Sequence, residues 1–322
     1  MDSQDKLAVI FDTNAYRKLT YEKSIIEAKE IIEKLRFDEK KNNVKAFAYP
    51  FVMLELANHL SDEADKSFEN CLSAIVALTN HNKSYDVEVQ SINILADSES
   101  QLCKILHNTT PESHSETIEK VAKIFRYITD NPDEESIKRI KGDLAEISYK
   151  VGEIEKQFIN DIQEYVVKGF NPNSKDWNPL KNDPALRKNV LEYLDSEDAL
   201  FRAARMHVVN TYTLLNKRLD DNVDYLSKIV LDKFKAPLYF YNEIIKRIVM
   251  SGCNLTKKKR GNWVWDIEIS FVIGFEHQVE NKRLRLVTGD GMIHEAASQA
   301  NSGSLVYKLE DYLEALEKRT LN

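Results

Sequence analysis

The chain has 322 residues, of which 43% are hydrophobic and 30% are charged, and its formal net charge is −7. No apolar run approaches the roughly 20 residues that span a bilayer, so the sequence argues against a membrane protein. An acidic chain repels nucleic acid on average, and binding of nucleic acid would therefore need a local basic cluster.

The N-terminal stretch MDSQDKLAVIFD lacks the basic and apolar regions of a signal peptide, so we expect a cytoplasmic protein. Cysteines stand at positions 71, 103 and 253, far apart and in no Cys-x-x-Cys pair. This spacing argues against both a disulfide framework and a zinc ribbon.

The N-terminal part of the chain predicts two strands that are each followed by a helix. Residues 7–11 (LAVIF) form a near-continuous apolar run, which is typical of a parallel strand buried on both faces. Residues 12–14 (DTN) come next, and a helical pattern then continues to about Phe37. A second short strand is predicted over residues 44–49, and Pro50 stands where the next helix would begin.

Residues 61–261 carry few strand signals and read as polar, helix-forming sequence. Residues 131–135 (NPDEE) predict the start of a long helix, with proline in its first turn and acids at the positive end of its dipole. Residues 169–184 contain three prolines and predict a loop. The long helix carries apolar residues in alternating steps of three and four, namely Ile137, Ile140, Leu144, Ile147, Val151, Ile154 and Phe158.

This heptad pattern is open to two interpretations. It can pack on a neighbouring helix of the same chain, or it can form an interface with a protein partner or a second copy of the chain.

Alternating strands and helices return after a basic loop at residues 256–261. We predict a partly helical segment over residues 263–274 and a strand over residues 283–287. A helix over residues 293–300 and a final strand over residues 304–309 follow, and a short helix then continues to about position 317. We therefore expect an α/β fold with a parallel sheet flanked by helices, built from residues 1–60 and 262–322, with a large all-helical insertion over residues 61–261.

Two of the predicted strands lead directly to an aspartate. Asp12 follows the first strand, and Asp290 follows the strand at residues 283–287 after a short turn. In an open parallel sheet, ligands bind beyond the carboxyl ends of the strands, because loops and helix N-termini converge there. Either aspartate alone could simply cap the next helix, but a pair at one edge indicates a site.

Two further acids fit the same edge of the sheet. Glu55 lies one turn into the second predicted helix between Leu54 and Leu56, an awkward place for a charge without a partner. Asp266 opens the predicted helix after the run WVW, where it too could be a helix cap.

Four carboxylates in one small volume would raise each other's proton affinity unless a cation compensated their charge. A set of oxygen ligands without nearby histidine or cysteine suits Mg²⁺ or Mn²⁺ better than zinc. Such an ion activates water and stabilises the charge that builds on a phosphate, so the expected reaction is phosphodiester hydrolysis.

These residues resemble the acidic signature of PIN-domain nucleases. The resemblance consists of DTN at 12–14 after the first strand, Glu55 in an ELA-type second helix, Asp266 opening the penultimate core helix, and TGD at 288–290 ending the next strand. It covers about 120 residues and implies a PIN-like parallel sheet flanked by helices, with Asp12, Glu55, Asp266 and Asp290 as catalytic ligands of Mg²⁺ or Mn²⁺. Members of the family mostly cut RNA, and related flap endonucleases act on DNA.

The third acid has an alternative. Asp198 also begins a helix-like stretch, SEDAL at 196–200, that is similar to the family's Asp-led helix. We prefer Asp266, because Asp198 lies more than ninety positions before Asp290.

Supporting roles are expected for Thr13, Asn14 and Thr288, which could orient water or neighbouring carboxylates, and which are also good turn and cap residues. Glu268 and Glu295 are close to the acids in sequence, and we expect them to be solvated helix residues.

Substrate contacts are expected from the densest basic run, which precedes Asp266 and consists of Lys257, Lys258, Lys259 and Arg260, followed by Trp263. Lysines can contact phosphates and a tryptophan can stack on a base, although a solvated loop explains the run equally well.

The sequence thus predicts a metal-dependent endonuclease that acts on RNA, and the family suggests a toxin or phage-defence role. One alternative is a nuclease of single-stranded or flap DNA. The other is a catalytically silent PIN-like scaffold whose helical insertion binds a protein partner.

Overall fold

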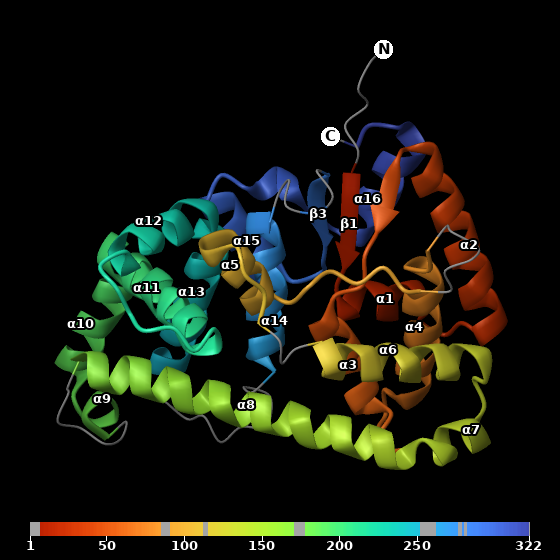
Figure 1. The fold of residues 1–322 in the computed structure, drawn as a ribbon, viewed down its shortest axis with the longest axis horizontal. Coiled ribbons are helices and arrows are strands. Elements are labelled where there is room, and N and C mark those ends of the chain that lie inside the picture. The colour runs from red at the N-terminus through yellow and green to blue at the C-terminus, as the bar shows by residue number, and fades with distance from the viewer. Residues whose placement is uncertain are drawn as a thin grey trace.

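A four-stranded parallel sheet with the strand order β2-β1-β3-β4 lies at the centre of the fold (Figure 1). The computed structural model describes residues 7–84, 91–111, 115–170, 178–251, 262–275, 279 and 282–321. The strands are β1 (Leu7–Phe11), β2 (Val44–Ala46), β3 (Arg283–Val287) and β4 (Val306–Tyr307). Both ends of the chain contribute two strands each, so the predicted α/β organisation around a parallel sheet is confirmed.

The central pair, β1 and β3, sets the position of the candidate site. Every residue of β1 is buried, as expected for an apolar strand with helices on both faces. The register pairs Leu7 with Arg283 and Phe11 with Val287. Asp12 donates its backbone N–H to the Val287 carbonyl at 3.0 Å, so the two strands end at the same level.

Helices surround the sheet and make up most of the described chain. The N-terminal ones are α1 (Thr13–Leu19), α2 (Ile25–Lys41), α3 (Pro50–His59) and α4 (Phe68–His81). The middle of the chain forms α5 (Ser98–His107), α6 (Ser115–Asp130), α7 (Glu134–Arg139), α8 (Lys141–Phe170), α9 (Asn178–Asn182), α10 (Pro184–Leu194), α11 (Glu197–Leu214), α12 (Val223–Lys233) and α13 (Lys235–Met250). The C-terminal part forms α14 (Trp263–Ser270), the 3₁₀ turn η1 (Phe271–Phe275), α15 (Gly291–Gln299), the 3₁₀ turn η2 (Gly303–Leu305) and α16 (Leu309–Lys318).

Helices α1, α2 and α4 pack together on one side of β1 and β3, and α13, α14 and α15 pack together on the other (Figure 1). The division into a core and an insertion stays a prediction. Helix α4 follows residue 61 in sequence, yet it packs against α1, α2 and α3 of the N-terminal part.

The single helix expected after Asp12 is two helices. Ser24 begins α2 with a capping box, in which its hydroxyl accepts from the Glu27 N–H and the Glu27 carboxylate accepts from the Ser24 N–H. Glu22 just before it has a φ of 55°, a left-handed conformation that cannot continue a helix. The interruption is therefore local in origin.

The long helix expected after residues 131–135 is interrupted at Ile140, which ends α7 before α8 begins. The heptad positions of α8 face the core of the same chain: Leu144, Ile147 and Val151 are buried, and Ile154 and Phe158 pack partly buried against them. A homodimer or partner interface through the insertion stays a prediction that would have to use other residues.

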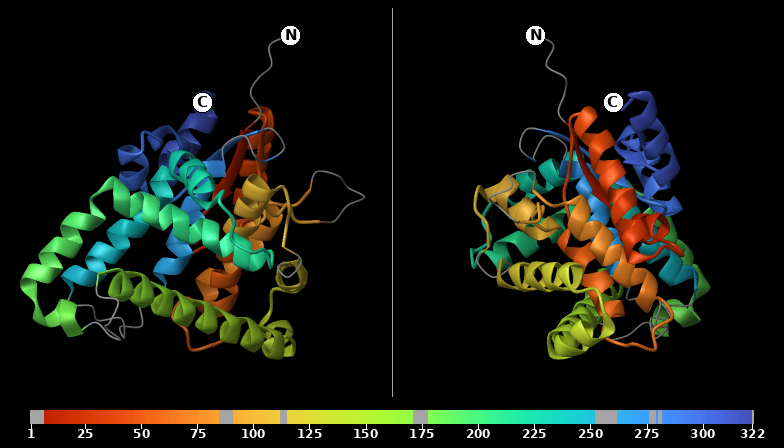
Figure 2. Two further views of the ribbon diagram at one scale, coloured as in Figure 1. Left: turned by 60° about the vertical axis from the view of Figure 1, so that its left-hand side comes forward. Right: turned by 90° about the vertical axis from the view of Figure 1, so that its right-hand side faces the viewer.

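Helix α8 lies along one side of the molecule, and both views of Figure 2 keep it there. It passes beneath α14 and α3 in Figure 1 and packs against both. Within the described residues, no helix is both long enough and apolar enough to cross a membrane.

Candidate functional site

Asp12 lies where β1 ends, and two hydrogen bonds fix its carboxylate. Its Oδ1 accepts from the Ala15 N–H at 2.5 Å, so it caps α1, and its Oδ2 accepts from the Thr288 hydroxyl at 2.5 Å. The side chain is 6% exposed. Burial raises the pKa of Asp12 to about 6, although hydrogen bonds from Thr288 and Ala15 oppose this shift and the charge of Glu55 adds to it. Asp12 is thus both a helix cap and a desolvated acid.

Glu55 projects from α3 toward the start of α1. The Thr13 hydroxyl donates to its Oε2 at 2.5 Å. Burial raises the pKa of Glu55, while the Thr13 hydrogen bond and the charges of His59 and Arg17 lower it. The two threonines predicted to support the acids therefore each donate to one of them.

Asp266 lies in the first turn of α14 but does not cap it, because the helix begins at Trp263 after Asn262. Burial, together with the charges of Asp290, Glu55 and Asp12, raises its pKa to about 8. Asp266 therefore holds a proton at neutral pH in the metal-free chain. This shift also shows that all four predicted acids are electrostatic neighbours.

Three of these acids line one small pocket of about 10 Å³, which matches the space of a single water molecule. The pocket is lined by Asp12, Thr13, Asn14, Phe51, Val52, Glu55, Trp265, Asp266 and Ile269. The predicted residue Asn14 is exposed at its rim. The predicted acids therefore reach one place from three separate parts of the sequence.

Asp290 lies beside this pocket and is not part of its lining. Its Oδ1 accepts from the N–H groups of Met292 at 2.7 Å and Ile293 at 3.1 Å, so it caps α15. The Asp290 N–H in turn donates to the Thr288 hydroxyl at 3.0 Å. Thr288 thus connects Asp12 with the turn that carries Asp290.

As these side chains are placed, no three histidine, cysteine, aspartate or glutamate residues of the described chain are close enough to hold a metal ion. Each of the carboxylates of Asp12, Glu55 and Asp290 instead accepts a hydrogen bond from a threonine hydroxyl or a helix N–H group. Their chemistry still fits Mg²⁺ or Mn²⁺, since all the donors are oxygens and their mutual repulsion favours a cation. To share one ion, the side chains would have to rotate toward each other.

Helix α8 of the predicted insertion contacts Trp265, a residue that lines this pocket. The Trp265 indole N–H donates to Oε1 of Glu155 at 3.0 Å, and the Trp265 ring packs against Phe51 with centroids 5.6 Å apart. The charge of Glu155 also raises the pKa of Glu55. No motif marks Glu155 in the sequence, because only the packing of α8 on α3 and α14 brings it here.

Replacing Trp265 by phenylalanine tests this contact between α8 and the site. The ring can still pack on Phe51, but the hydrogen bond to Glu155 is lost and the buried ring becomes smaller. We therefore expect the free energy of unfolding to fall by about 1 kcal/mol from the hydrogen bond, and further from the lost packing. Urea denaturation measures the change. Glu155→Gln is the control, since its amide oxygen still accepts the bond and a smaller loss is expected; equal stability of Trp265→Phe and the wild type would contradict the contact.

The other predicted site residues lie elsewhere. Asp198, the alternative third acid, is exposed in the first turn of α11 and does not line the pocket. The basic run at residues 257–260 lies outside the described residues. Trp263 is half-buried at the start of α14 and packs against the core, and whether it binds substrate stays a prediction.

Glu268 corrects one expectation, because it is half-buried and is not a fully solvated helix residue. The Ser98 hydroxyl donates to its Oε2, and burial together with the charge of Glu99 raises its pKa to about 8. No local sequence pattern indicates this environment, since Ser98 and Glu99 belong to a distant helix, α5. Glu295 is exposed on α15, as expected.

Comparison of the chain with models of protein families, with curated protein sequences and with solved structures gives no match.

Proposed function

We propose that this protein is a Mg²⁺- or Mn²⁺-dependent endonuclease with a PIN-like core, and that its substrate is RNA. The observation that carries the proposal is that Asp12, Glu55 and Asp266 line one pocket and that their pKa values are all raised. Desolvated acids that repel each other are costly for a fold, and they are found where a cation or a reaction requires them.

The position of the acids supports the same proposal. Asp12 and Asp290 follow the carboxyl ends of the two central parallel strands, the edge at which open α/β sheets bind their ligands. Asp12, Glu55 and Asp266, with Asp290 beside them, are the residues that would hold the ion. A divalent cation held there would supply a Lewis acid and a water of lowered pKa for hydrolysis of a phosphodiester.

The chain's own groups would position the reactants. Thr288 and Thr13 hold the carboxylates of Asp12 and Glu55 in place through their hydroxyl groups. Arg17, on α1, brings positive charge to the neighbourhood of Glu55. Positive groups beside the acids suit contacts with the phosphates that flank a scissile bond. The proposed toxin or phage-defence role rests on the resemblance to PIN-domain nucleases.

A catalytically silent scaffold is the second candidate. It is favoured by the spacing of the acids, since no three of them in the described chain are close enough to share an ion. In that case, the helices between α4 and α14 would serve a protein partner.

A cleavage assay separates these functions. The full chain is incubated with labelled RNA, single-stranded DNA and flap DNA in Mg²⁺, in Mn²⁺ or in EDTA. We expect cleavage of RNA with either metal and none in EDTA. Cleavage of DNA and not of RNA would support the alternative of a DNA nuclease. Absence of cleavage, together with absence of Mn²⁺ binding in calorimetry, would support the catalytically silent scaffold.

A further inference from the structure

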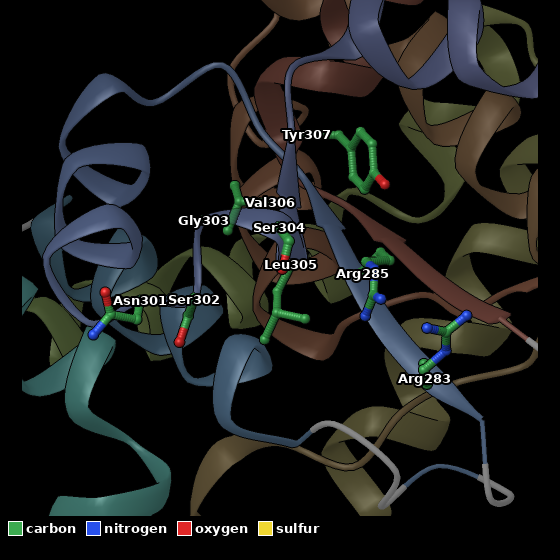
Figure 3. Close-up of a pocket in the computed structure, with 9 residues that line it drawn as sticks. All are labelled: Arg283, Arg285, Asn301, Ser302, Gly303, Ser304, Leu305, Val306 and Tyr307. Atoms are coloured by element: carbon green, nitrogen blue, oxygen red, sulfur yellow. The ribbon is translucent and has the colours of Figure 1, made fainter. Parts of the chain in front are cut away.

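A second and larger pocket, of about 480 Å³, lies beside β3 (Figure 3), and it shares no lining residue with the acidic pocket. It is lined by Arg283, Arg285, Asn301, Ser302, Gly303, Ser304, Leu305, Val306 and Tyr307. These residues come from β3 and from the segment that returns to the sheet as β4, and none of the nine is acidic.

The pocket exists because β4 is much shorter than β3. The sequence predicted a strand over residues 304–309, but only Val306 and Tyr307 pair with the sheet, opposite Leu286 and Val287. The first half of β3 therefore extends beyond its neighbour.

The opposite wall of the pocket is set by the end of α15. Asn301 has a φ of 58° and reverses the chain there, and the Ser302 N–H donates to the Ala297 carbonyl at 2.7 Å. The turn η2 follows, so the returning chain reaches the sheet late and stands away from the start of β3.

Two guanidinium groups form one wall. Arg283 and Arg285 are two residues apart on β3, so their side chains leave the same face of the sheet. Arg285 is only 4% exposed, and its Nη1 donates to the Leu284 carbonyl at 3.0 Å, which fixes the orientation of its planar group. Figure 3 shows Arg285 between Arg283 and the segment that carries Ser304 and Leu305.

Polar groups that can donate hydrogen bonds complete the lining. Hydroxyls come from Ser302, Ser304 and Tyr307, and an amide comes from Asn301. A guanidinium group presents several N–H donors in a plane that matches the oxygens of a phosphate, and hydroxyls add further donors. The pocket volume is within the range of about 300–1,000 Å³ that is usual for small-molecule sites.

We propose that this pocket binds a phosphate-bearing ligand of the size of a nucleotide. The phosphate would contact the guanidinium groups of Arg283 and Arg285 and the hydroxyl of Ser304, and the remaining volume would take the nucleoside. The site is separate from the acidic one, because Arg283 begins β3 whereas Asp290 follows its other end. The proposal concerns binding alone and does not depend on nuclease activity.

Calorimetric titration of the full chain in EDTA tests it, since no divalent ion is then present to hold phosphate at the acids. The ligands are AMP, adenosine, inorganic phosphate, and a short oligonucleotide with a 5′-phosphate or a 5′-hydroxyl. We expect AMP to bind and adenosine to bind at least about tenfold more weakly, because the charged hydrogen bonds are lost.

Three variants locate the bound phosphate. Arg283→Gln removes one guanidinium group, Ser304→Glu places a negative charge at an exposed position of the lining, and Arg218→Gln removes an exposed charge from elsewhere as the control. We expect the first two to weaken AMP binding by about tenfold or more and the control to leave it unchanged. Ser304→Glu is a surface change, so the test stands even if Arg283→Gln folds poorly.

The ligand series also separates the sources of phosphate. Tighter binding of AMP than of the 5′-phosphorylated oligonucleotide supports a free nucleotide, and the reverse order supports the terminal phosphate of a nucleic acid. Equal binding of AMP and inorganic phosphate would contradict a ligand of nucleotide size, because the nucleoside would then contribute nothing to binding. The proposal is overturned if no phosphate compound binds, if adenosine binds as well as AMP, or if both pocket variants bind AMP like the wild type.

Discussion

Replacement of Asp12 by asparagine is expected to lower the rate of RNA cleavage by at least about 1,000-fold, which corresponds to roughly 4 kcal/mol. Asp12 is the acid with the strongest claim to the site, because it lines the pocket, ends the central strand β1 and is held by Thr288. Asparagine has the same shape and still caps a helix well, so the Ala15 N–H keeps an acceptor. The loss should therefore appear in kcat and not in the folded fraction.

The control for this variant is Asp198→Asn. Asp198 is also an aspartate near a helix start, but it is exposed on α11 and outside the pocket. We expect its kcat to match the wild type, with both variants giving wild-type circular dichroism. Cleavage that persists in Asp12→Asn would falsify the role of the acidic pocket.

The metal-free chain should lose stability as the pH rises from about 4 to about 8, and Asp266 should account for the upper part of this loss. Its pKa is about 8 in the folded chain, against an ordinary value of 3.8 for an aspartate, and that of Asp12 is about 6. Between these limits the folded chain binds more protons than the unfolded one, so the free energy of unfolding falls with pH. The stabilisation that the protonated forms of Asp12 and Asp266 provide is fully present below about pH 4. It is lost as the pH rises through about 6, the pKa of Asp12, and then through about 8, the pKa of Asp266.

Urea denaturation of wild type and Asp266→Asn at several pH values, in EDTA, measures this effect. At pH 8 we expect the variant to be more stable than the wild type by about 1–3 kcal/mol, because a desolvated charge has been removed. At pH 4 the two should agree. Subtracting the free energies of unfolding of the two proteins at each pH removes the effect of other titrating groups. One such group is the buried His207, because burial lowers its pKa to about 4.

Proton release gives a second reading of the same groups. If Asp12 and Asp266 bind Mn²⁺, they must first lose protons, so titration near pH 7 should release protons in the wild type and fewer in Asp266→Asn. Calorimetry in two buffers of different ionisation enthalpy measures the number of protons released.

The raised pKa of Asp266 would be contradicted if the difference in stability between the wild type and Asp266→Asn did not change with pH.

The parts of the fold that local patterns determine were predicted from the sequence. The run at residues 7–11 is apolar throughout because β1 is buried on both faces, and this pattern also placed Asp12 at the edge of the sheet. The strand at residues 283–287 was predicted with the bounds that β3 has. Their pairing in register then brings the Thr288 hydroxyl to Asp12, whereas the sequence had indicated only that Thr288 could orient water or a neighbouring carboxylate.

Features that depend on packing between distant segments could not be predicted in this way. Glu155 reaches the site only through the position of α8, and Glu268 is desolvated only because α5 packs near it. The shortness of β4 reflects the turn at Asn301, which apolar periodicity does not record. The break between α1 and α2 did have a local signal, the capping box of Ser24 and Glu27.

The most direct test of the central claim is the position of Mn²⁺ in crystals of the full chain soaked with this ion, located by its anomalous scattering. We predict a peak at bonding distance from an oxygen of the Asp12 carboxylate and from an oxygen of at least one of Glu55 and Asp266. The threonine hydroxyls of residues 13 and 288 should then bond carboxylate oxygens that do not contact the ion. Crystals that take up Mn²⁺ only elsewhere, or not at all, would contradict the account.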